Sequence, residues 1–240
     1  PENVTAPEDA KITDNGTAFE ITPEVEGNTL KREETEQAVR EAIDTGKSEL
    51  NFEEAGLYEA PSVRSDDETL NNQVTQMNSL TAANLTYDFV DRQYVVNRDV
   101  IKEWLTQDAE GNYTIDETQA AAWVRQMAYE TDTFGLAHTF KTSLGPTIEL
   151  KAGGDYGWVI NKDKTTAALV EAVKAGTQGA IEPVYLYSAN DRSQNDIGGT
   201  YVEICISQQK MWCYKDGQLV VETPVVTGSH ATGYDTPAGS

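Results

Sequence analysis

The chain has 240 residues, of which 38% are hydrophobic and 8% aromatic, enough for one or two folded domains. Forty acidic against 18 basic residues give a net charge of −22. Phosphate backbones and anionic membrane surfaces repel such a chain, so we expect no nucleic acid partner. No stretch approaches the roughly 20 apolar residues of a membrane span, and the acidic start is unlike a signal peptide. We therefore expect any export signal or membrane anchor to lie upstream of this chain.

The first predicted helix lies in LKREETEQAVREAIDTG, residues 30–46, where Gly46 is placed to end it. A second predicted helix lies in INKDKTTAALVEAVKAG, residues 160–176, where the apolar positions and the final glycine recur 130 residues later. The apolar face of the first helix consists of Ala38, Val39, Ala42 and Ile43. A Leu-Tyr pair follows each helix, in NFEEAGLYEAP and in IEPVYLYSA. We interpret this as an internal repeat whose first copy lacks its front half; a chance likeness of two amphipathic helices is the alternative.

The segment between these helices predicts further helices and strands. The Ser-x-x-Glu spacing from Ser65 predicts a capped helix over about 66–80, and ANLTYDF alternates as a strand does. Asn97 is expected to cap a short helix carrying Ile101, Trp104 and Leu105. Asp116 is expected to cap a longer helix with Ala120, Trp123, Val124 and Met127 on its buried face. HTFKTSLGPTIEL then predicts a hairpin that turns at residues 143–146.

From Gly199 onward the pattern indicates strands only. YVEICISQQKMWCYKDGQLVVETPVVTG contains two strand runs about a short polar turn, and Asp216-Gly217 is typical of a second hairpin turn. The fold class expected is therefore α+β accessory modules followed by the start of a β-rich domain. The boundaries expected are 1–64 for the back half of a first module, 65–198 for a complete second module, and 199–240 for the first strands of the β-rich domain.

Several stretches of the sequence together resemble the bacterial L,D-transpeptidases, which cross-link peptidoglycan. These are GGDYGWVIN (153–161), NDIGGTYVEICISQQKMWCYKDGQLV (195–220), VVTGSHATGYDTPAG (225–239) and DTFGLAHTFKT (132–142). The Tyr-x-Asp-Thr-Pro-x-Gly run after Val-Thr-Gly is the most specific of them. The resemblance covers residues 65–240, and the first 62 residues are similar to the back half of another copy of the family's peptidoglycan-binding-like accessory module.

The resemblance implies a function and a location. Enzymes of this family use a cysteine thiolate to attack a peptide stem, release D-alanine and form third-to-third cross-links by acyl transfer, with no metal or organic cofactor. The partners implied are peptidoglycan stem peptides or glycan. The implied location is extracellular, at the cell wall or anchored to the membrane and facing the wall, in a Gram-positive bacterium. A membrane would be reached only through an upstream anchor.

The resemblance also implies where the catalytic centre lies. The family's nucleophile stands in a Ser/Thr-His-Gly-Cys segment, with a further histidine upstream of it, and both are expected beyond Ser240. We therefore expect no catalytic residue in this chain and expect the chain itself to be inactive. The alternative is a non-catalytic module that binds peptidoglycan or acts as a spacer.

The two cysteines, Cys205 and Cys213, lack the His-Gly context of the family's nucleophile. If the hairpin pivots near Gln209, each lies four residues from the pivot, so a cross-strand disulfide is possible. Two free thiols are the alternative, and a metal site lacks further ligands.

The histidines and tryptophans favour structural or unassigned roles. His138 is expected to be a structural strand residue, and His230 a solvated loop residue. Trp104 and Trp123 fall on apolar helical faces and are expected in the core. Trp158, Trp212 and Tyr201 are candidates for a glycan or peptide surface, although burial of Trp158 is an equal alternative.

Overall fold

The computed structural model describes residues 3–235 and forms two compact units. The first unit runs to Thr81 and includes Leu105–Thr114, and the second comprises Ala82–Trp104 and the chain from Ile115 onward. Helices and short sheets occur together, so the predicted α+β class is confirmed. The predicted module boundaries at residues 64 and 198 stay a prediction, because the two units are defined by which residues pack together, whereas the modules were defined by sequence similarity.

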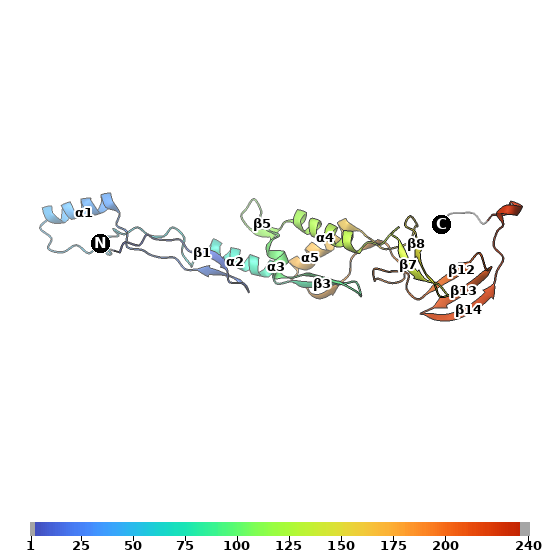
Figure 1. The fold of residues 1–240 in the computed structure, drawn as a ribbon. Coiled ribbons are helices and arrows are strands. Elements are labelled where there is room, and N and C mark those ends of the chain that lie inside the picture. The colour runs from blue at the N-terminus through green and yellow to red at the C-terminus, as the bar shows by residue number, and fades with distance from the viewer. Residues whose placement is uncertain (1–2, 236–240) are drawn as a thin grey trace. The chain divides into compact units, whose positions relative to one another are not determined.

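The first unit contains a β-hairpin with a helix packed against it (Figure 1). The strands β1 (Lys11–Asp14) and β2 (Phe19–Thr22) pair in antiparallel fashion, and α2 (Glu68–Leu80) lies against them. The side chain of Asn78 in α2 accepts a hydrogen bond from the Phe19 N–H and donates one to the Phe19 carbonyl, both at 2.8 Å. This amide therefore ties the helix to the start of β2.

The first helix, α1 (Arg32–Asp44), belongs to the same unit and has no buried residue. Val39 and Ile43, which belong to its predicted apolar face, are 36% and 71% exposed. The predicted end of the helix is confirmed, since Gly46 adopts a left-handed φ of 71° and its N–H bonds to the Ile43 carbonyl.

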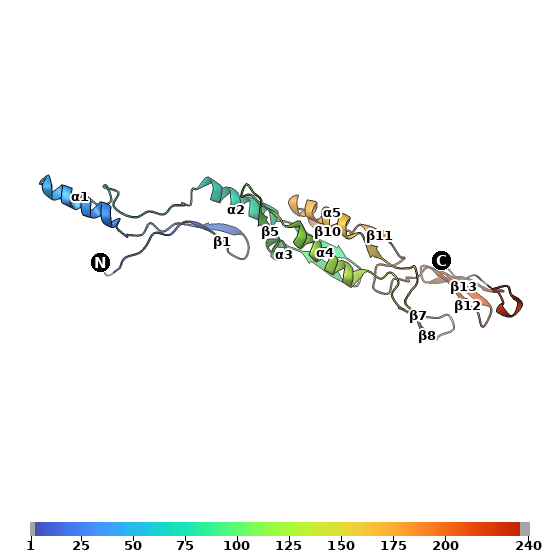
Figure 2. The same cartoon turned by 90° about the horizontal axis from the view of Figure 1, so that it is seen from above.

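The core of the second unit is a three-stranded sheet with helices beside it (Figures 1 and 2). The sheet order is β10-β3-β4, with β10 parallel and β4 antiparallel to the central β3. Two longer helices, α4 and α5, pack against each other. The elements are β3 (Asn84–Asp88), β4 (Gln93–Val96), α3 (Arg98–Lys102), α4 (Glu117–Thr131), α5 (Lys162–Lys174) and β10 (Gln178–Ile181).

Two details of the helix ends differ from the sequence prediction. The side chain that caps α2 is that of Asp67, which accepts a hydrogen bond from the Leu70 N–H, and not that of Ser65. The helix after Asn97 ends at Lys102, so Leu105 begins the strand β5 (Leu105–Gln107), which pairs with β6 (Tyr113–Ile115). The caps predicted at Asn97 and Asp116 are confirmed.

Two further two-stranded sheets lie in the second unit. The strands β7 (His138–Lys141) and β8 (Thr147–Leu150) form the predicted hairpin, which Thr142 closes by bonding its N–H to the Pro146 carbonyl. The strands β9 (Val159–Ile160) and β11 (Tyr185–Tyr187) pair with each other in antiparallel fashion. In the sequence, β9 precedes α5 and β11 follows it.

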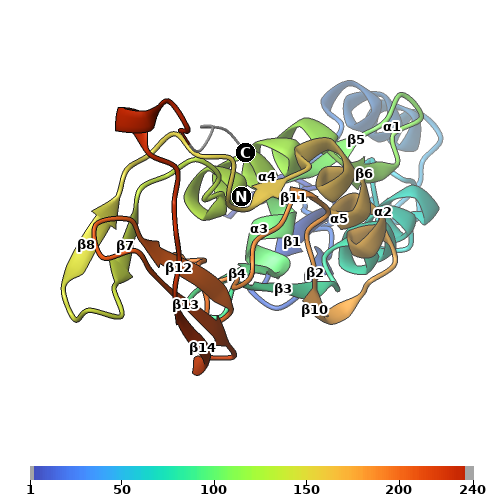
Figure 3. The same cartoon turned by 90° about the vertical axis from the view of Figure 1, so that its right-hand side faces the viewer.

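The last part of the second unit is a three-stranded antiparallel sheet beside the β7–β8 hairpin (Figure 3). Its strands are β12 (Tyr201–Cys205), β13 (Lys210–Lys215) and β14 (Gln218–Pro224), in that order across the sheet. Asp216 and Gly217, at φ of 52° and 76°, form the predicted turn between β13 and β14. A single 3-10 turn, η1 (His230–Thr232), follows, and the Thr-Pro-x-Gly stretch, residues 236–239, lies outside the described residues. None of the helices between residues 3 and 235 has the length and apolar character to cross a bilayer.

Candidate functional site

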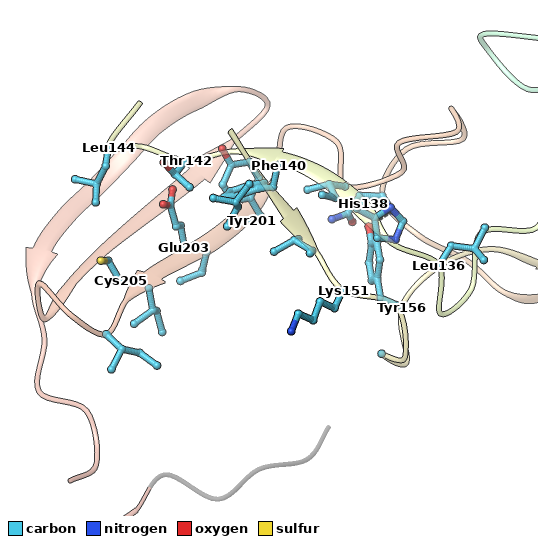
Figure 4. Close-up of a pocket in the computed structure, with 18 of the residues that line it drawn as sticks. Leu136, His138, Phe140, Thr142, Leu144, Lys151, Tyr156, Tyr201, Glu203 and Cys205 are labelled. Atoms are coloured by element: carbon cyan, nitrogen blue, oxygen red, sulfur yellow. Dashed lines mark hydrogen bonds between the residues drawn. The ribbon is translucent and has the colours of Figure 1, made fainter. Parts of the chain in front are cut away.

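A cavity of about 800 Å³ lies in the second unit between the β7–β8 hairpin and the strand β12 (Figure 4). This volume is within the range of ligand-binding clefts. Every residue from Tyr201 to Ser207 lines it, so the cavity follows the whole length of β12. Its apolar walls include Leu136, Phe140, Leu144, Ile148, Leu150 and Ile197.

Hydrogen bonds and aromatic contacts hold the hairpin against the sheet. The Ser143 N–H and hydroxyl both donate to the Glu203 carboxylate, at 2.9 and 2.5 Å, and the same hydroxyl lies 2.8 Å from the Tyr214 hydroxyl. The Phe140 ring meets Tyr201 edge-on at 5.2 Å, and Tyr201 stacks on Tyr214 at 4.9 Å. The two walls of the cavity are therefore fixed to each other on one side.

A buried polar network lies beneath the hairpin end of the cavity. Asp196 is fully buried and one of its oxygens accepts a hydrogen bond from the Thr133 hydroxyl, which itself accepts one from the Trp158 N–H at 2.9 Å. The other carboxylate oxygen accepts no hydrogen bond within residues 3–235, and the Nδ1 atom of His138 lies 3.5 Å from it. A buried carboxylate therefore lies beside an imidazole ring that lines the cavity.

Tyrosine 156 connects this network to the loop that leads to β12. Its hydroxyl donates to the Asp196 carbonyl at 2.8 Å and accepts from the Asn190 N–H at 3.0 Å. Its ring lies edge-on to His138, at 6.4 Å between centroids. Burial raises the pKa of the Tyr156 hydroxyl.

Arginine 192 anchors the same loop to the sheet and helix core. Its guanidinium lies 4.2 Å from the Phe89 ring centroid and 4.9 Å from that of Trp158. It also donates hydrogen bonds to the Tyr185 hydroxyl and to the Thr131 carbonyl, at 3.0 and 3.1 Å. Trp158 is thus a partner of Arg192 and donates through its indole N–H to the Asp191 carbonyl at 2.6 Å.

The register of the β12–β13 hairpin differs from the one that a Cys205–Cys213 disulfide needs. Cys205 lies opposite Lys210 and Cys213 opposite Val202, because the hairpin turns over residues 206–209 and does not pivot on Gln209. Since side chains alternate between the two faces of a strand, the two thiols point to opposite faces of the sheet. Both are free in the structure.

The two thiols differ in their surroundings. Cys205 lines the cavity and lies 3.3 Å from the Ser207 hydroxyl, and hydrogen bonding from Ser207 lowers the pKa of this thiol. Within residues 3–235 no histidine nitrogen bonds to either thiol, and no cluster of three or more histidine, cysteine or acidic side chains is arranged to hold a metal ion. The described residues therefore contain no cysteine–histidine pair of the kind that cysteine acyl transfer uses.

The remaining sequence candidates take structural positions. His230 is 97% exposed and pairs with Asp235 at 2.8 Å. Trp104 is buried, as predicted, and it meets the half-buried Trp123 edge-on. Trp212 is buried in the β12–β14 sheet, so it is not available as an exposed binding surface.

Comparison with known families identifies the chain. A family model described as a putative peptidoglycan binding domain matches residues 2–51 and 63–182, well over half of the sequence. The chain belongs to this peptidoglycan-binding family. The second match contains the β10-β3-β4 sheet, α4 and α5, and extends through His138 and the β7–β8 hairpin on one side of the cavity.

Solved structures show a likeness that extends further along the chain. A crystal structure of a cysteine-to-serine mutant of the Enterococcus faecium L,D-transpeptidase is 28% identical, with a TM-score of 0.54 over 70% of this chain and 66% of that one. The carbamoyl enzyme that Ldtfm forms with avibactam is 29% identical, with a TM-score of 0.56 over 71% of this chain and 65% of that one. The peptidoglycan-binding chain thus spans slightly less than two thirds of each structure. No curated protein sequence matches it significantly.

The family resemblance read from the sequence is therefore confirmed, but sequence reasoning did not identify the polar network. Asp196 was part of a motif that carried the resemblance, and no signal in the sequence joined it to Thr133 or His138, which lie about 60 residues earlier. Short polar and glycine-rich segments such as Asn-Asp-Ile-Gly usually predict exposed loops. The sequence therefore did not indicate that Asp196 is buried.

Proposed function

We propose that this chain is the peptidoglycan-binding part of an L,D-transpeptidase that acts outside the cell, at the wall. The observation that carries the proposal is the match of one peptidoglycan-binding family model to two separate segments, residues 2–51 and 63–182. The likeness to two L,D-transpeptidase structures supports the enzymatic context. In that context, the whole enzyme forms third-to-third cross-links between stem peptides by cysteine acyl transfer.

The proposal includes two related modules, and the two helices α1 and α5 support it. Each has 13 residues, and the bounds of α5 lie 130 positions after those of α1. Both helices end in the same pair of hydrogen bonds, which a left-handed glycine and the residue after it donate from their N–H groups to carbonyls of the helix. These bonds are Gly46 to Ile43, Lys47 to Ala42, Gly176 to Val173 and Thr177 to Ala172, each from N–H to carbonyl.

The chain segments that follow these helices support the same relationship. Before α1, the Lys31 N–H bonds to the Leu57 carbonyl, and before α5 the Asn161 N–H bonds to the Val184 carbonyl. The bridge between Leu30 and Tyr58 likewise has a counterpart in Ile160 and Tyr185. The structural counterpart of Leu57-Tyr58 is therefore Val184-Tyr185, and not the Leu-Tyr pair that the sequence comparison aligned.

Within this proposal, the chain itself supplies binding and positioning, while the nucleophilic cysteine belongs to the whole enzyme. The described residues support this division because neither Cys205 nor Cys213 has a histidine as hydrogen-bond partner. We expect neither thiol to be acylated by a carbapenem. A role as a spacer that sets a distance along the wall is the alternative to binding.

Sedimentation of the purified chain with isolated sacculi tests the binding proposal. We expect the chain to sediment with sacculi, whereas a folded control protein of similar size and net negative charge stays in the supernatant. The control is needed because a chain of net charge −22 interacts with any polycationic contaminant. Retention no greater than that of the control would reject wall binding and favour the spacer role.

A further inference from the structure

Two β-hairpins, β1–β2 and β7–β8, occupy equivalent places in the two repeats. Each has strands of four residues that form four opposed residue pairs. A left-handed glycine follows each hairpin, and the spacing between Gly27 and Gly157 equals that between α1 and α5. A Cβ atom on Gly27 would fall 2.6 Å from the Pro7 nitrogen, and one on Gly157 would fall 2.4 Å from the Phe134 Cα. Both glycines thus pack against the segment just before the hairpin, so the two hairpins correspond.

The first hairpin contacts an element that lies outside its own family match. The match to residues 2–51 contains β1 and β2, whereas α2 lies in the match to residues 63–182. The half-buried amide of Asn78 in α2 accepts a hydrogen bond from the Phe19 N–H, directly after the hairpin turn, and donates one to the carbonyl of the same residue. The helix α2 therefore belongs to the second match by sequence and packs in the first unit.

The second hairpin contacts the element that follows its own match. The strands β7 and β8 lie in the match to residues 63–182, and β12 lies beyond it. The Ser143 N–H, in the hairpin turn, donates to the carboxylate of the half-buried Glu203 in β12 at 2.9 Å. The Phe140 ring meets the Tyr201 ring edge-on at 5.2 Å and adds an apolar contact (Figure 4). The N–H bond spans 60 residues of sequence, and its counterpart in the first repeat spans 59.

A backbone N–H makes such a contact independent of the turn sequence. The two turns differ in length and sequence, with Asn-Gly-Thr-Ala at 15–18 and Thr-Ser-Leu-Gly-Pro at 142–146, and the acceptors are an amide and a carboxylate. Every residue except proline offers an N–H of this kind. Both bonds are partly buried, so breaking them leaves polar groups that water does not fully satisfy. The same kind of hairpin can therefore hold a helix in one repeat and a strand in the other.

We infer that the hairpin of each repeat is a docking surface for the next domain of the same chain, and that an N–H at its turn, bound to a side-chain oxygen of that domain, holds the two together. The element held is α2 in the first repeat and the β12–β14 sheet in the second. The inference goes beyond the proposed function, because it holds whether or not the chain binds the wall. It predicts that the β10-β3-β4 sheet and the β12–β14 sheet move as one body.

A pair of substitutions at Ser143 tests the second contact. Ser143 is the second residue of a turn that the Gly145 N–H closes on the Thr142 carbonyl, and proline is favoured at this position. Ser143→Pro therefore keeps the turn and removes both the N–H and the hydroxyl, whereas Ser143→Ala removes the hydroxyl alone. The difference between the two variants isolates the contribution of the N–H.

Backbone amide relaxation, measured by NMR on the isotope-labelled chain, gives the result. We expect the amides of the β10-β3-β4 and β12–β14 sheets to share one rotational correlation time in the unsubstituted chain and in Ser143→Ala. In Ser143→Pro the β12–β14 amides should show a shorter correlation time, with their chemical shifts still those of a folded sheet. Separate correlation times in the unsubstituted chain, or the same behaviour of both variants, would overturn the inference.

The first contact gives a test that does not involve the β12–β14 sheet. An isolated two-stranded hairpin is marginally stable, so the amides of β1–β2 should depend on α2 for protection from hydrogen exchange. Asn78→Ala should speed the exchange of amides in residues 11–22 about tenfold, because it removes two partly buried hydrogen bonds. Asn72→Ala, at an exposed position of the same helix, should leave their exchange unchanged. Equal exchange in the two variants would overturn the inference.

Discussion

Gly157 lies directly against the backbone of Phe134, so that a Cβ atom on Gly157 would fall 2.4 Å from the Phe134 Cα. The φ of Gly157 is 132°, which side chains of L-residues rarely adopt. We predict that Gly157→Ala lowers the free energy of unfolding of the second unit by about 2 to 4 kcal/mol, through strain and overpacking together. Urea denaturation followed by tryptophan fluorescence measures this.

Gly154→Ala, three residues earlier in the same glycine-rich segment, is the control for Gly157. An added Cβ there meets no atom within 4 Å, and Gly154 does not have a left-handed φ. Its denaturation midpoint should stay close to that of the unsubstituted chain. If both variants lost a similar amount of stability, the contact with Phe134 would not be the cause of the loss. The prediction for Gly157 would then be wrong.

The Thr133 hydroxyl is the centre of the polar network beneath the cavity, because it both donates to Asp196 and accepts from the Trp158 N–H. Thr133→Val keeps the shape of the side chain but leaves a buried carboxylate and a backbone N–H without their partner. We predict a loss of about 2 to 4 kcal/mol, the sum of two unmade hydrogen bonds of which one is to a charged group. Thr133→Ser keeps the hydroxyl, and its thermal unfolding should recover most of this loss.

The helices of the chain could be predicted from the sequence because local signals determine them. Gly46 ends α1, and Asn97 and Asp116 cap α3 and α4, by interactions that span only a few residues. Burial could not be predicted in the same way. Leu169 and Val173 of α5 are fully buried, whereas Val39 and Ile43, at the corresponding positions of α1, are exposed. The same pattern therefore gives different burial, since burial depends on a neighbour that the pattern does not contain.

The candidate site was less predictable than the helices, because it joins segments that are distant in the chain. Ser143 and Glu203 lie 60 residues apart, and Thr133 and Asp196 lie 63 apart. The sequence did predict the β7–β8 hairpin and the strands β12 and β13. It did not predict that they face each other across a cavity. The predicted turn after β12 also lay too far along the chain, at Gln209, and this shift in register placed the two cysteines on the same face.

The Tyr94 hydroxyl donates a 2.6 Å hydrogen bond to Glu130, and this pair predicts a pH dependence. Burial, together with this bond, raises the pKa of Tyr94 to about 12, and the same bond lowers the pKa of Glu130. A raised tyrosine pKa gives stability that is present below pH 10 and lost as the pH rises toward 12, while a lowered carboxyl pKa gives stability that is lost as the pH falls below 4.5.

The stability difference between the unsubstituted chain and Tyr94→Phe should therefore be largest between about pH 5 and pH 10 and shrink on either side. Urea denaturation across this pH range measures it. Tyr129→Phe is the matched control, since Tyr129 lies in the same helix as Glu130 and is 83% exposed. A difference that stays constant from pH 4 to pH 11.5 would show that the Tyr94 hydroxyl contributes to stability without its hydrogen bond to the Glu130 carboxylate.

The positions of Cys205 and Cys213 on opposite faces of the β12–β13 hairpin predict two free thiols. We expect an alkylating reagent to add to both cysteines without prior reduction, and the intact mass to show two adducts. Cys205 should react faster near pH 8, because hydrogen bonding from Ser207 lowers its pKa and increases the thiolate fraction. Ser207→Ala should slow the reaction of Cys205 and leave that of Cys213 unchanged, which peptide mapping after short exposure measures. Adducts that appear only after reduction would instead show a disulfide, and with it a hairpin register shifted from the one described.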